Sequence, residues 1–325
     1  MTPLERALRD RILAKGSISL EAYMEACNDY YYATRDPLGA SGDFTTAPEI
    51  SQMFGEIIGA ALADCWMRAG CPKNAVYAEL GPGRGTLSSD ALRVLKAAGF
   101  RGDVHMIETS PVLRQAQHEK VPNAAWHDSI DDLPAGPLLL VANEFLDALP
   151  IRQHVAGIER QVIVAAGGLA FDRDGEVIET SPARDHAVRT VADRCVASGG
   201  VAIFIDYGHE RSAAGDTLQA VRKHRFAPVL AQPGEQDLTS HVDFEALTMA
   251  ARSAGAEVTP LVCQGDWLLR LGIKARAEAL TRANPGRRDA LQSAVDRLTS
   301  REEMGKLFKV IAVHSRGWPA PQGLP

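Results

Sequence analysis

The sequence predicts an α/β fold with a mostly parallel sheet and helices on both faces of that sheet. Short apolar runs that suit buried strands alternate with helix-like segments along most of the chain, and this alternation is typical of parallel strands joined by helical crossovers. The composition is consistent with this fold class, because a chain of 325 residues with 46% hydrophobic residues can build a packed core. Together with only 23% charged residues, it argues against a disordered protein. The length alone suggests about two domains.

Charge and hydropathy exclude several classes of protein. No apolar run approaches the roughly 18 residues of a membrane-spanning helix, so we expect no membrane insertion. A net charge of −6 and only 6% aromatic residues speak against a nucleic-acid partner, because such partners demand phosphate neutralisation and base stacking. Five scattered cysteines without a two-residue gap indicate neither a zinc site nor a redox motif, and we expect no bound metal. The first residues contain charges and no apolar signal core, so we expect a cytoplasmic location.

The first 72 residues are predicted to form a helical segment ahead of the sheet. Helices are expected over 3–14 and from residue 19. After a polar, glycine-rich stretch, Pro48 suits the first turn of another helix. Apolar residues recur at helical spacing from Ile50 to Cys65, which predicts a packed amphipathic helix that ends near Gly70.

The remaining residues, 73–325, are predicted to form the sheet core. The expected strands are 76–80, 104–107, 124–127, 138–142, 201–205, 257–262 and 308–313. The expected helices between them are 88–98, 111–119, 183–197 and 244–253. Three insertions are expected, at about 151–175, 208–242 and 265–305. The first contains an antiparallel hairpin, because strand-like runs at 160–165 and 169–172 flank Gly167-Gly168. Residues 208–241 look irregular, and 265–300 look helical with a break at 284–286.

The strand at 76–80 runs into the most informative motif of the sequence, Glu79-Leu80-Gly81-Pro82-Gly83-Arg84-Gly85-Thr86. Glycines let the backbone approach a ligand closely, and the next helix offers its N-terminal N–H groups to an anion. We therefore expect cofactor binding by Glu79, Gly81, Gly83 and Gly85. A nicotinamide site is the alternative, although a dinucleotide fingerprint would place its third glycine where Thr86 stands. The glycine spacing resembles motif I of class I S-adenosylmethionine (SAM) methyltransferases, which implies their Rossmann-like fold and SAM as the cofactor.

Two acidic residues follow the next strands of the predicted sheet. Glu108 ends the strand at 104–107, where a carboxylate can accept hydrogen bonds from both ribose hydroxyls. This arrangement serves NAD and SAM alike. Asp128 follows the strand at 124–127, and the resemblance to class I methyltransferases implies a contact with the adenine amino group. For each of the two, a solvated loop carboxylate is the alternative.

A third group of polar residues, Asn143, Glu144 and Asp147, follows the apolar strand at 138–142. In an open parallel sheet, the carboxyl ends of the strands face the ligand crevice. Carboxylates there could bind a guanidinium in a bidentate manner and help it lose a proton, so we expect these three residues to be catalytic. The alternative is a helix N-cap formed by Asn143 or Glu144, and both interpretations can hold together.

Five blocks of the sequence occur in the order that is typical of the MidA family, and the chain is similar to that family from about residue 20 to residue 315. The blocks are 42–52 (GDFTTAPEISQ), 79–85 (ELGPGRG), 143–148 (NEFLDA), 206–208 (DYG) and 237–244 (DLTSHVDF). The family is SAM-dependent and includes the mitochondrial assembly factor of respiratory complex I. The resemblance therefore implies a protein arginine N-methyltransferase, with a complex I subunit as a candidate substrate.

Two of these blocks carry further candidate residues. Residues 42–52 could fold across the cofactor as a lid, although a loop with a helix cap is the alternative. The polar side chains of this lid are Asp43, Thr45, Thr46 and Ser51. His241 lies in a polar loop at the same edge of the sheet and could accept a proton, although a single loop histidine is more often merely exposed. The basic run 222–225 is interpreted as a solvated face or at most part of a partner surface.

The sequence therefore predicts a SAM-dependent methyltransferase that acts on a protein side chain. Catalysis in such an enzyme rests mostly on holding two reactants in line. Two other functions stay open from the sequence alone: a non-catalytic assembly factor that binds SAM, and a nicotinamide-dependent oxidoreductase. The sequence identifies neither the methylated protein, nor the degree of methylation, nor the oligomeric state.

Overall fold

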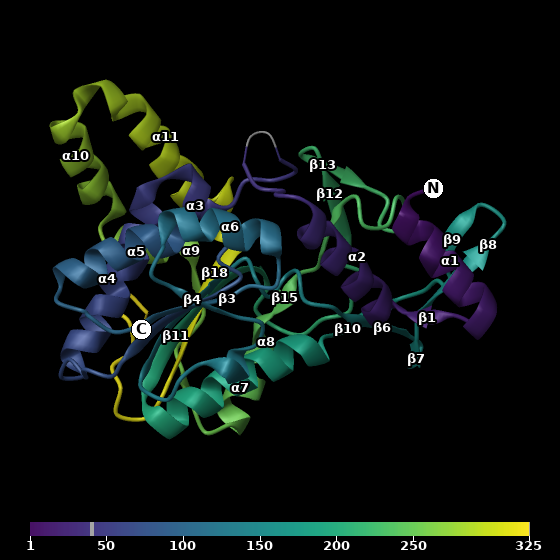
Figure 1. The fold of residues 1–325 in the computed structure, drawn as a ribbon, viewed down its shortest axis with the longest axis horizontal. Coiled ribbons are helices and arrows are strands. Elements are labelled where there is room, and N and C mark those ends of the chain that lie inside the picture. The colour runs from purple at the N-terminus through teal and green to yellow at the C-terminus, as the bar shows by residue number, and fades with distance from the viewer. Residues whose placement is uncertain (40–41, 325) are drawn as a thin grey trace.

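The computed structural model describes residues 1–39 and 42–324, and within them one sheet of nine strands forms the core (Figure 1). Seven strands follow one another in the order β16-β18-β11-β5-β2-β3-β4, while β15 pairs with β11 and β17 pairs with β18. Their bounds are β2 Val76–Leu80, β3 Val104–Ile107, β4 Ala125–His127, β5 Leu138–Asn143, β11 Gly200–His209, β15 Val242–Asp243, β16 Glu257–Val258, β17 Val262–Cys263 and β18 Phe308–His314. Neighbouring strands from β4 to β11 are parallel, and β18 is antiparallel to β11. The predicted mostly parallel sheet is confirmed.

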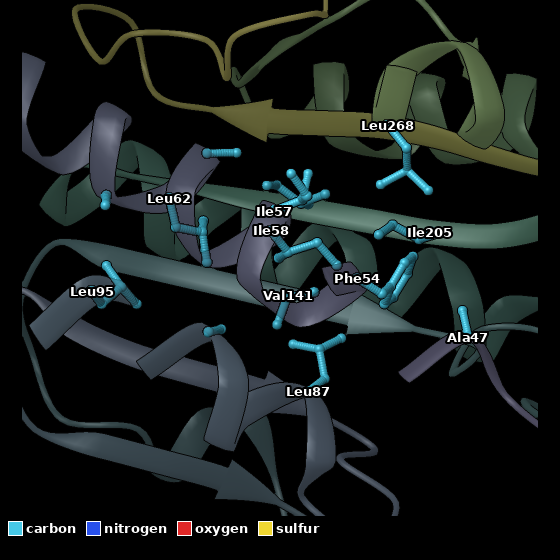
Figure 2. Packing of buried hydrophobic residues seen from close by; sticks show 14 of the residues in the cluster. Ala47, Phe54, Ile57, Ile58, Leu62, Leu87, Leu95, Val141, Ile205 and Leu268 are labelled. Carbon is cyan, nitrogen blue, oxygen red and sulfur yellow. The ribbon is translucent and has the colours of Figure 1, made fainter. Parts of the chain in front are cut away.

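Helices cover both faces of this sheet. α4 (Gln52–Arg68) and α5 (Thr86–Ala97) pack on one face, and α7 (Pro182–Ser198) and α8 (Phe244–Ser253) pack on the other. All residues of β2 and β5 are buried as a result, which explains why these strands read as continuous apolar runs. Figure 2 shows Ile58 of α4 beside Val141 of β5 within the buried cluster.

Of the other helices of the core, α6 follows β3, η1 follows β4, and the rest lie between β17 and β18. Their bounds are α6 Pro111–Lys120, η1 Ile130–Asp132, α9 Gln264–Arg270, α10 Ile273–Ala283, η2 Pro285–Arg287, α11 Arg288–Thr299 and α12 Met304–Leu307. The predicted break at 284–286 is confirmed, because η2 separates α10 from α11. Among the helices of the described residues, none is long and apolar enough to cross a membrane.

The N-terminal helices and the first two insertions form a second body beside the sheet, which we call the accessory lobe (Figure 1). It contains α1 (Pro3–Lys15), α2 (Leu20–Thr34) and three small sheets. The strands of those sheets are β1 Ile18–Ser19, β6 Arg152–Val155, β7 Ile158–Glu159, β8 Gln161–Ala165, β9 Gly168–Phe171, β10 Val177–Thr180, β12 Gln219–Arg222, β13 Arg225–Ala227 and β14 Asp237–Thr239. Buried side chains of the lobe include Leu8, Tyr23, Val162, Ala220 and Leu238. The lobe therefore joins segments that are far apart in the sequence.

Two predictions about the insertions have different outcomes. The predicted hairpin in the first insertion is confirmed, because β8 and β9 pair antiparallel on either side of Ala166-Gly167. The prediction of an irregular segment at 208–241 is wrong, because β12, β13 and β14 form a sheet there. These strands are only three or four residues long, and the hydrophobic residues that they bury, Ala220 and Leu238, do not form an apolar run.

The helix predicted from Pro48 to near Gly70 is divided at Ser51. α3 (Ala47–Ile50) precedes this residue and α4 follows it. Ser51 has extended backbone angles, and its hydroxyl accepts a hydrogen bond from the N–H of Met53 at 3.3 Å. It is therefore the N-cap of α4. The apolar spacing continues across this residue, so the interruption leaves no trace in the hydrophobic pattern.

The strand predicted at 257–262 is also divided, into β16 and β17. Thr259 donates its backbone N–H to the carbonyl of Ala312, and its hydroxyl accepts the N–H of Ala312 at 2.9 Å. A threonine side chain thus replaces a backbone partner between the two strands. β11 extends beyond the predicted 201–205 to His209, because its end pairs with β15.

Candidate active site

A cavity of about 980 Å³ lies where the carboxyl ends of the core strands meet the accessory lobe. The loops after β2, β3, β4 and β5 line it from the side of the sheet, and α2, β12 and β14 line it from the side of the lobe. Open parallel sheets bind ligands at this edge. The volume lies at the upper end of the roughly 300–1,000 Å³ of small-molecule sites, so a cofactor and the side chain of a second substrate fit together.

The glycine loop after β2 presents backbone to this cavity. Gly81 and Gly83 line it with φ angles of 59° and 53°, in the left-handed region that favours glycine. A Cβ at Gly81 would lie 2.8 Å from the Phe145 ring, and a Cβ at Gly83 would lie 2.9 Å from the Leu38 side chain. Gly85 is the N-cap of α5 and is not among the described residues that line the cavity. The loop therefore needs glycine at both lining positions.

Glu79 is buried at the end of β2 and lines the cavity beside the loop. The hydroxyls of Ser88 and Tyr77 donate hydrogen bonds to its carboxyl group. Burial raises the pKa of Glu79 to about 7. Since Ser88 lies in α5, these bonds connect the strand before the glycine loop with the helix after it.

Glu108 follows β3, and its side chain is held by two donors. Its Oε1 accepts the backbone N–H of Ser110 at 2.8 Å, and its Oε2 accepts Nε2 of Gln117 at 3.1 Å. Burial raises its pKa above the usual value. Gln117 also donates to the carbonyl of Gly83 at 2.7 Å, so one amide joins Glu108 to the glycine loop. Gln117 was not singled out from the sequence. It lies one helical turn after the apolar Leu113, and this spacing places both residues on the buried face of α6.

Asp128 lies at the opening of the cavity. Its side chain is 79% exposed, and it accepts a hydrogen bond from Arg114 at 2.6 Å. Arg114 also donates to the carbonyl of Glu108. The structure thus brings Asp128 and Glu108 to one side of the cavity.

Glu144 follows β5 with a φ of 52°, which is uncommon for a residue other than glycine and costs backbone free energy. Its Oε1 accepts the N–H of Ala47 at 3.0 Å and Nδ2 of Asn143 at 3.1 Å. Burial raises the pKa of Glu144 to about 8. Oδ1 of Asn143 is buried without a hydrogen-bond partner in the described part of the chain, and Asn143 lines the cavity. An unpaired buried oxygen of this kind is unfavourable unless a hydrogen-bond donor approaches it.

Asp147 lies three residues further along, in a loop that buried charges hold in place. The carboxyl group of Asp206 accepts the backbone N–H groups of Leu146 and Asp147 at 3.0 and 3.2 Å. The guanidinium of Arg184 donates to the carbonyls of the same two residues at 2.6 and 3.0 Å. Burial raises the pKa of Asp147 and of Asp206 and lowers the pKa of Arg184. Neither Asp206 nor Arg184 was singled out from the sequence as a residue of the site.

Asp237 is a further buried carboxyl group of the cavity, and sequence reasoning assigned it no role. It begins β14 of the accessory lobe, and its Oδ1 accepts the hydroxyl of Tyr32 at 2.8 Å. Burial raises its pKa to about 7, and the nearby charge of Asp147 adds to the rise. The available signal was its place at the start of the block 237–244. We call Glu144, Asp147 and Asp237 the acid cluster.

His241 lines the cavity and is half-buried. Its ring meets the ring of Tyr207 edge-on at 5.5 Å, and burial lowers its pKa. The hydroxyl of Tyr207 donates to Thr239 at 2.6 Å and accepts Nε2 of Gln219 at 2.9 Å. His241 is therefore a neutral group that faces the same space as the acid cluster.

The predicted lid residues have different positions. Thr45 and Thr46 line the cavity. Asp43 is not among the described lining residues; its carboxyl group accepts the hydroxyl of Tyr31 and the N–H of Lys223, each at 2.7 Å. Ser51 caps α4, as described above. Roles of these residues toward a cofactor stay predictions.

The residues present fit S-adenosylmethionine. The glycine loop leaves space at its surface, a buried carboxyl group follows the second strand, and acids suit a cationic ligand. Among the described residues, no group of three or more His, Cys, Asp and Glu side chains could hold a metal ion. A parallel sheet with the antiparallel strand β18, together with this loop, defines a Rossmann-like methyltransferase of class I.

Comparison with known proteins identifies the family. Residues 57–168 and 161–262 match a family described as S-adenosyl-L-methionine-dependent methyltransferases. The chain belongs to this family, whose relatives include the protein arginine methyltransferase NDUFAF7, and the resemblance to MidA proteins is confirmed. The cofactor is therefore SAM, and the nicotinamide alternative for the glycine loop is not supported.

Three curated relatives and one solved structure illustrate the similarity. The mitochondrial NDUFAF7 homolog of Drosophila melanogaster is 33% identical over 95% of this chain and 84% of its own length. The NDUFAF7 protein of Danio rerio, also named mitochondrial, is 34% identical over 94% of this chain and 85% of its own length. The mitochondrial NDUFAF7 protein of Homo sapiens is 31% identical over 96% of this chain and 83% of its own length. A Burkholderia thailandensis protein crystallised with S-adenosyl-homocysteine has 29% identity and a TM-score of 0.85 over 98% of this chain and 93% of its own.

Proposed function

We propose that this methyltransferase transfers the methyl group of SAM to an arginine guanidinium nitrogen of a protein substrate. The observation that carries the proposal is the acid cluster, three carboxyl groups from two parts of the molecule that line one cavity with the glycine loop; Asp147 and Asp237 are buried and Glu144 is partly buried. No salt bridge in the described part of the chain includes any of the three. A cationic side chain would supply the missing positive charge. The names of the relatives, protein arginine methyltransferase, agree with this choice.

The acid cluster would bind and orient the guanidinium. Carboxylates accept paired N–H groups of a guanidinium in a planar fork, and the arriving cation lowers the pKa of each carboxyl group toward its usual value. SAM, when bound, supplies an electrophilic methyl group. The accepting nitrogen must lose a proton, and a carboxyl group with a pKa near neutrality is suited to receive it. We assign this role to Glu144 or Asp147, with Asn143 as a further acceptor and His241 as a helper.

The cofactor would lie along the carboxyl ends of β2, β3 and β4. We assign its methionine end to Gly81 and Gly83, its ribose to Glu108 and its adenine to Asp128. Glu79, which lines the cavity, would contact the cofactor beside the loop, and Gly85 would support the loop as the N-cap of α5. Thr45 and Thr46 would contact the cofactor from the lid, which Asp43 fastens to β12 and β13.

The biological setting is also part of the proposal. We propose a subunit of respiratory complex I as the substrate and the cytoplasm as the location. We keep the division into an N-terminal segment, residues 1–72, and a catalytic core, residues 73–325, as a prediction. Helix α4 of the first segment packs into the same hydrophobic cluster as the sheet of the second.

The test is to incubate the purified protein with radiolabelled SAM and a lysate of its own organism. We expect one or a few labelled proteins whose label lies on arginine after digestion and mass spectrometry. Asp147→Asn and Glu144→Gln should lose the labelling while S-adenosyl-homocysteine still raises the melting temperature. A label on lysine, glutamine or a terminal amine would contradict the proposal. Site variants that lose methylation but still support complex I assembly would favour a role as assembly factor by binding alone.

A further inference from the structure

β12 and β13 form a hairpin in the accessory lobe (Figure 1). The turn of this hairpin carries a run of basic residues beside residues that line the cavity. The run is Arg222, Lys223, His224 and Arg225, and Arg222 pairs with Arg225 across the hairpin. The residues on either side of the run, Val221 and Phe226, line the cavity. In the ranges 1–39 and 42–324, no carboxylate forms a salt bridge with these basic side chains. Arg222 donates a hydrogen bond to Oε1 of Gln232, whereas Lys223 and Arg225 are exposed, so their charges are free to meet a partner in front of the active site.

The backbone of the turn holds these side chains outward. Lys223 and His224 both have left-handed backbones, with φ of 49° and 59°. Two-residue turns of this kind favour Asn and Gly, so large side chains here cost conformational free energy. Asp43 compensates in part, because its carboxyl group accepts the N–H of Lys223 at 2.7 Å and its carbonyl accepts the N–H of His224 at 2.9 Å. The turn is thus fixed to the lid segment while its side chains stay exposed.

Phe226 is the most exposed of the large hydrophobic residues described, at 79%. It also lines the cavity, so its ring stands at the rim where a bound chain would pass. Aromatic and arginine side chains at such positions are enriched among residues that dominate binding to protein partners. We call residues 221–226 the basic rim.

We propose that the basic rim is the docking surface for the substrate protein, and that it binds an acidic segment with an apolar side chain next to the methylated arginine. This inference rests on the proposed function. The cavity carries the acid cluster inside and the basic rim at its mouth. A substrate segment with one arginine among acidic residues would therefore place its arginine at the acid cluster and its acidic residues at the basic rim. A uniformly basic chain would be repelled at the rim, and such paired attraction and repulsion sets register and specificity. The acid cluster and a net charge of −6 oppose a nucleic acid at the same place.

The test uses fluorescein-labelled synthetic peptides and the full chain saturated with S-adenosyl-homocysteine. Each peptide has one central arginine, flanked by Asp and Phe in one peptide, by Ser in the second and by Lys in the third. We expect the acidic peptide to bind about tenfold more tightly than the serine peptide at low salt, and the difference to shrink at high salt. The lysine peptide should bind most weakly.

Two variants separate docking from folding. Lys223→Glu with Arg225→Glu should abolish or reverse the preference for the acidic peptide. Phe226→Ser should weaken binding of this peptide, which also carries the Phe, several-fold and leave binding of the serine peptide nearly unchanged. Arg287→Glu with Arg288→Glu is the matched control, because it makes the same change of charge at the exposed N-cap and first residue of α11. All variants should keep the thermal shift produced by S-adenosyl-homocysteine. An unchanged preference in the rim variant, or an equal loss in the control, would overturn the proposal.

Two further experiments test the class of partner and the methylated side chain. If the protein binds an RNA oligonucleotide or anionic lipid vesicles and the rim variant loses that binding, the rim serves another partner and the proposal fails. A peptide with lysine in place of the central arginine tests the proposed function separately. Equal methyl transfer to both peptides, with the acidic preference intact, would refute arginine methylation and leave the docking surface standing.

Discussion

The backbone N–H of Ala47 donates a hydrogen bond to the carboxyl group of Glu144 at 3.0 Å, across 97 residues of sequence. Ala47 begins α3, directly after the segment that carries Thr45 and Thr46, and Glu144 follows the central strand β5. The bond therefore joins the predicted lid to the predicted catalytic loop. The backbone of Glu144 itself is left-handed, and its N–H donates to the carbonyl of Ile205 at 2.9 Å. The position of the lid and the chemistry of Glu144 are linked through this contact.

Glu144→Gln and Asp147→Asn should each reduce methyl transfer by roughly 10²–10⁴-fold, because each removes a group that could receive a proton and bind the guanidinium. Glutamine can still accept the N–H of Ala47, so the lid should stay in place. The measurement is transfer of radiolabelled methyl groups, with calorimetric titration of S-adenosyl-homocysteine as the test of cofactor binding. Glu278→Gln, on the exposed face of α10, is the control. Undiminished transfer in both site variants would remove these residues from the catalytic assignment.

The rate should rise with pH across the neutral range. Burial raises the pKa of Glu144 to about 8 and the pKa of Asp237 to about 7, and the cluster must be ionised to bind a guanidinium. We expect kcat/KM for the protein substrate to increase between pH 6 and pH 8.5, since this quantity reports groups of the free enzyme. Asp237→Asn removes a neighbouring negative charge and should move the rise to lower pH. A flat profile at saturating SAM would argue against this use of the cluster.

Asp237→Asn should also stabilise the protein, and more so at alkaline pH. The folded-state pKa of about 7 is above the usual 3.8, so the native protein holds a proton that the unfolded chain releases. The contribution to stability is present below pH 3.8 and is lost as pH rises through 7. At pH 8.5 the variant should gain about 1–3 kcal/mol in the free energy of unfolding, and much less at pH 4.5. Urea unfolding at the two pH values measures this, with Asp193→Asn on the exposed side of α7 as the control. An equal gain at both values would show that the effect is not linked to the proton.

The sheet, its polar strand ends and the hairpin of β8 and β9 could be predicted from local patterns, whereas the assembly of the accessory lobe from distant segments could not. Continuous apolar strands and the glycine loop mark the carboxyl edge, and so Asn143, Glu144 and Asp147 were found from residues next to them in sequence. Asp237 meets Tyr32 across 205 residues. The accessory lobe, which brings Tyr32 and Asp237 together, is stabilised by pairing of strands that are distant in sequence, such as the two-residue strand β1 with β8. No periodicity signals a strand of that length.

Gly81→Ala should abolish binding of the cofactor with a limited effect on folding. The added methyl group would meet the ring of Phe145 at 2.8 Å in a loop that lines the cavity, so the loop or the ring must shift. Gly157→Ala provides a matched control, because Gly157 has a φ of 78° and open space around its Cβ position. The control carries the backbone penalty of about 1 kcal/mol without the clash. Thermal shift with S-adenosyl-homocysteine should therefore disappear in the first variant and persist in the second; if both respond equally, the loop does not require glycine for its ligand.

Gln117→Ala should weaken cofactor binding although Gln117 is not among the described residues that line the cavity. Its amide donates to Gly83 and Glu108, and its Oε1 accepts the indole N–H of Trp126 at 2.7 Å. The substitution leaves buried groups without partners, which costs about 1–3 kcal/mol. It also frees two elements that would hold the methionine and ribose parts of SAM. We expect a loss of roughly 5–100-fold in affinity for S-adenosyl-homocysteine, measured by calorimetric titration.

The size of that loss separates positioning from simple destabilisation. Gln117→Glu keeps an acceptor for Trp126 but places a second carboxyl group beside Glu108, so it should bind the cofactor at least as weakly as Gln117→Ala. Gln292→Ala removes only an exposed hydrogen bond to Asp296 and should bind normally. If Gln117→Ala lowers the melting temperature but binds S-adenosyl-homocysteine with unchanged affinity, the amide stabilises the fold alone. If affinity falls while Glu108→Gln causes no further loss in the double variant, Gln117 acts through Glu108, as the shared hydrogen bond requires.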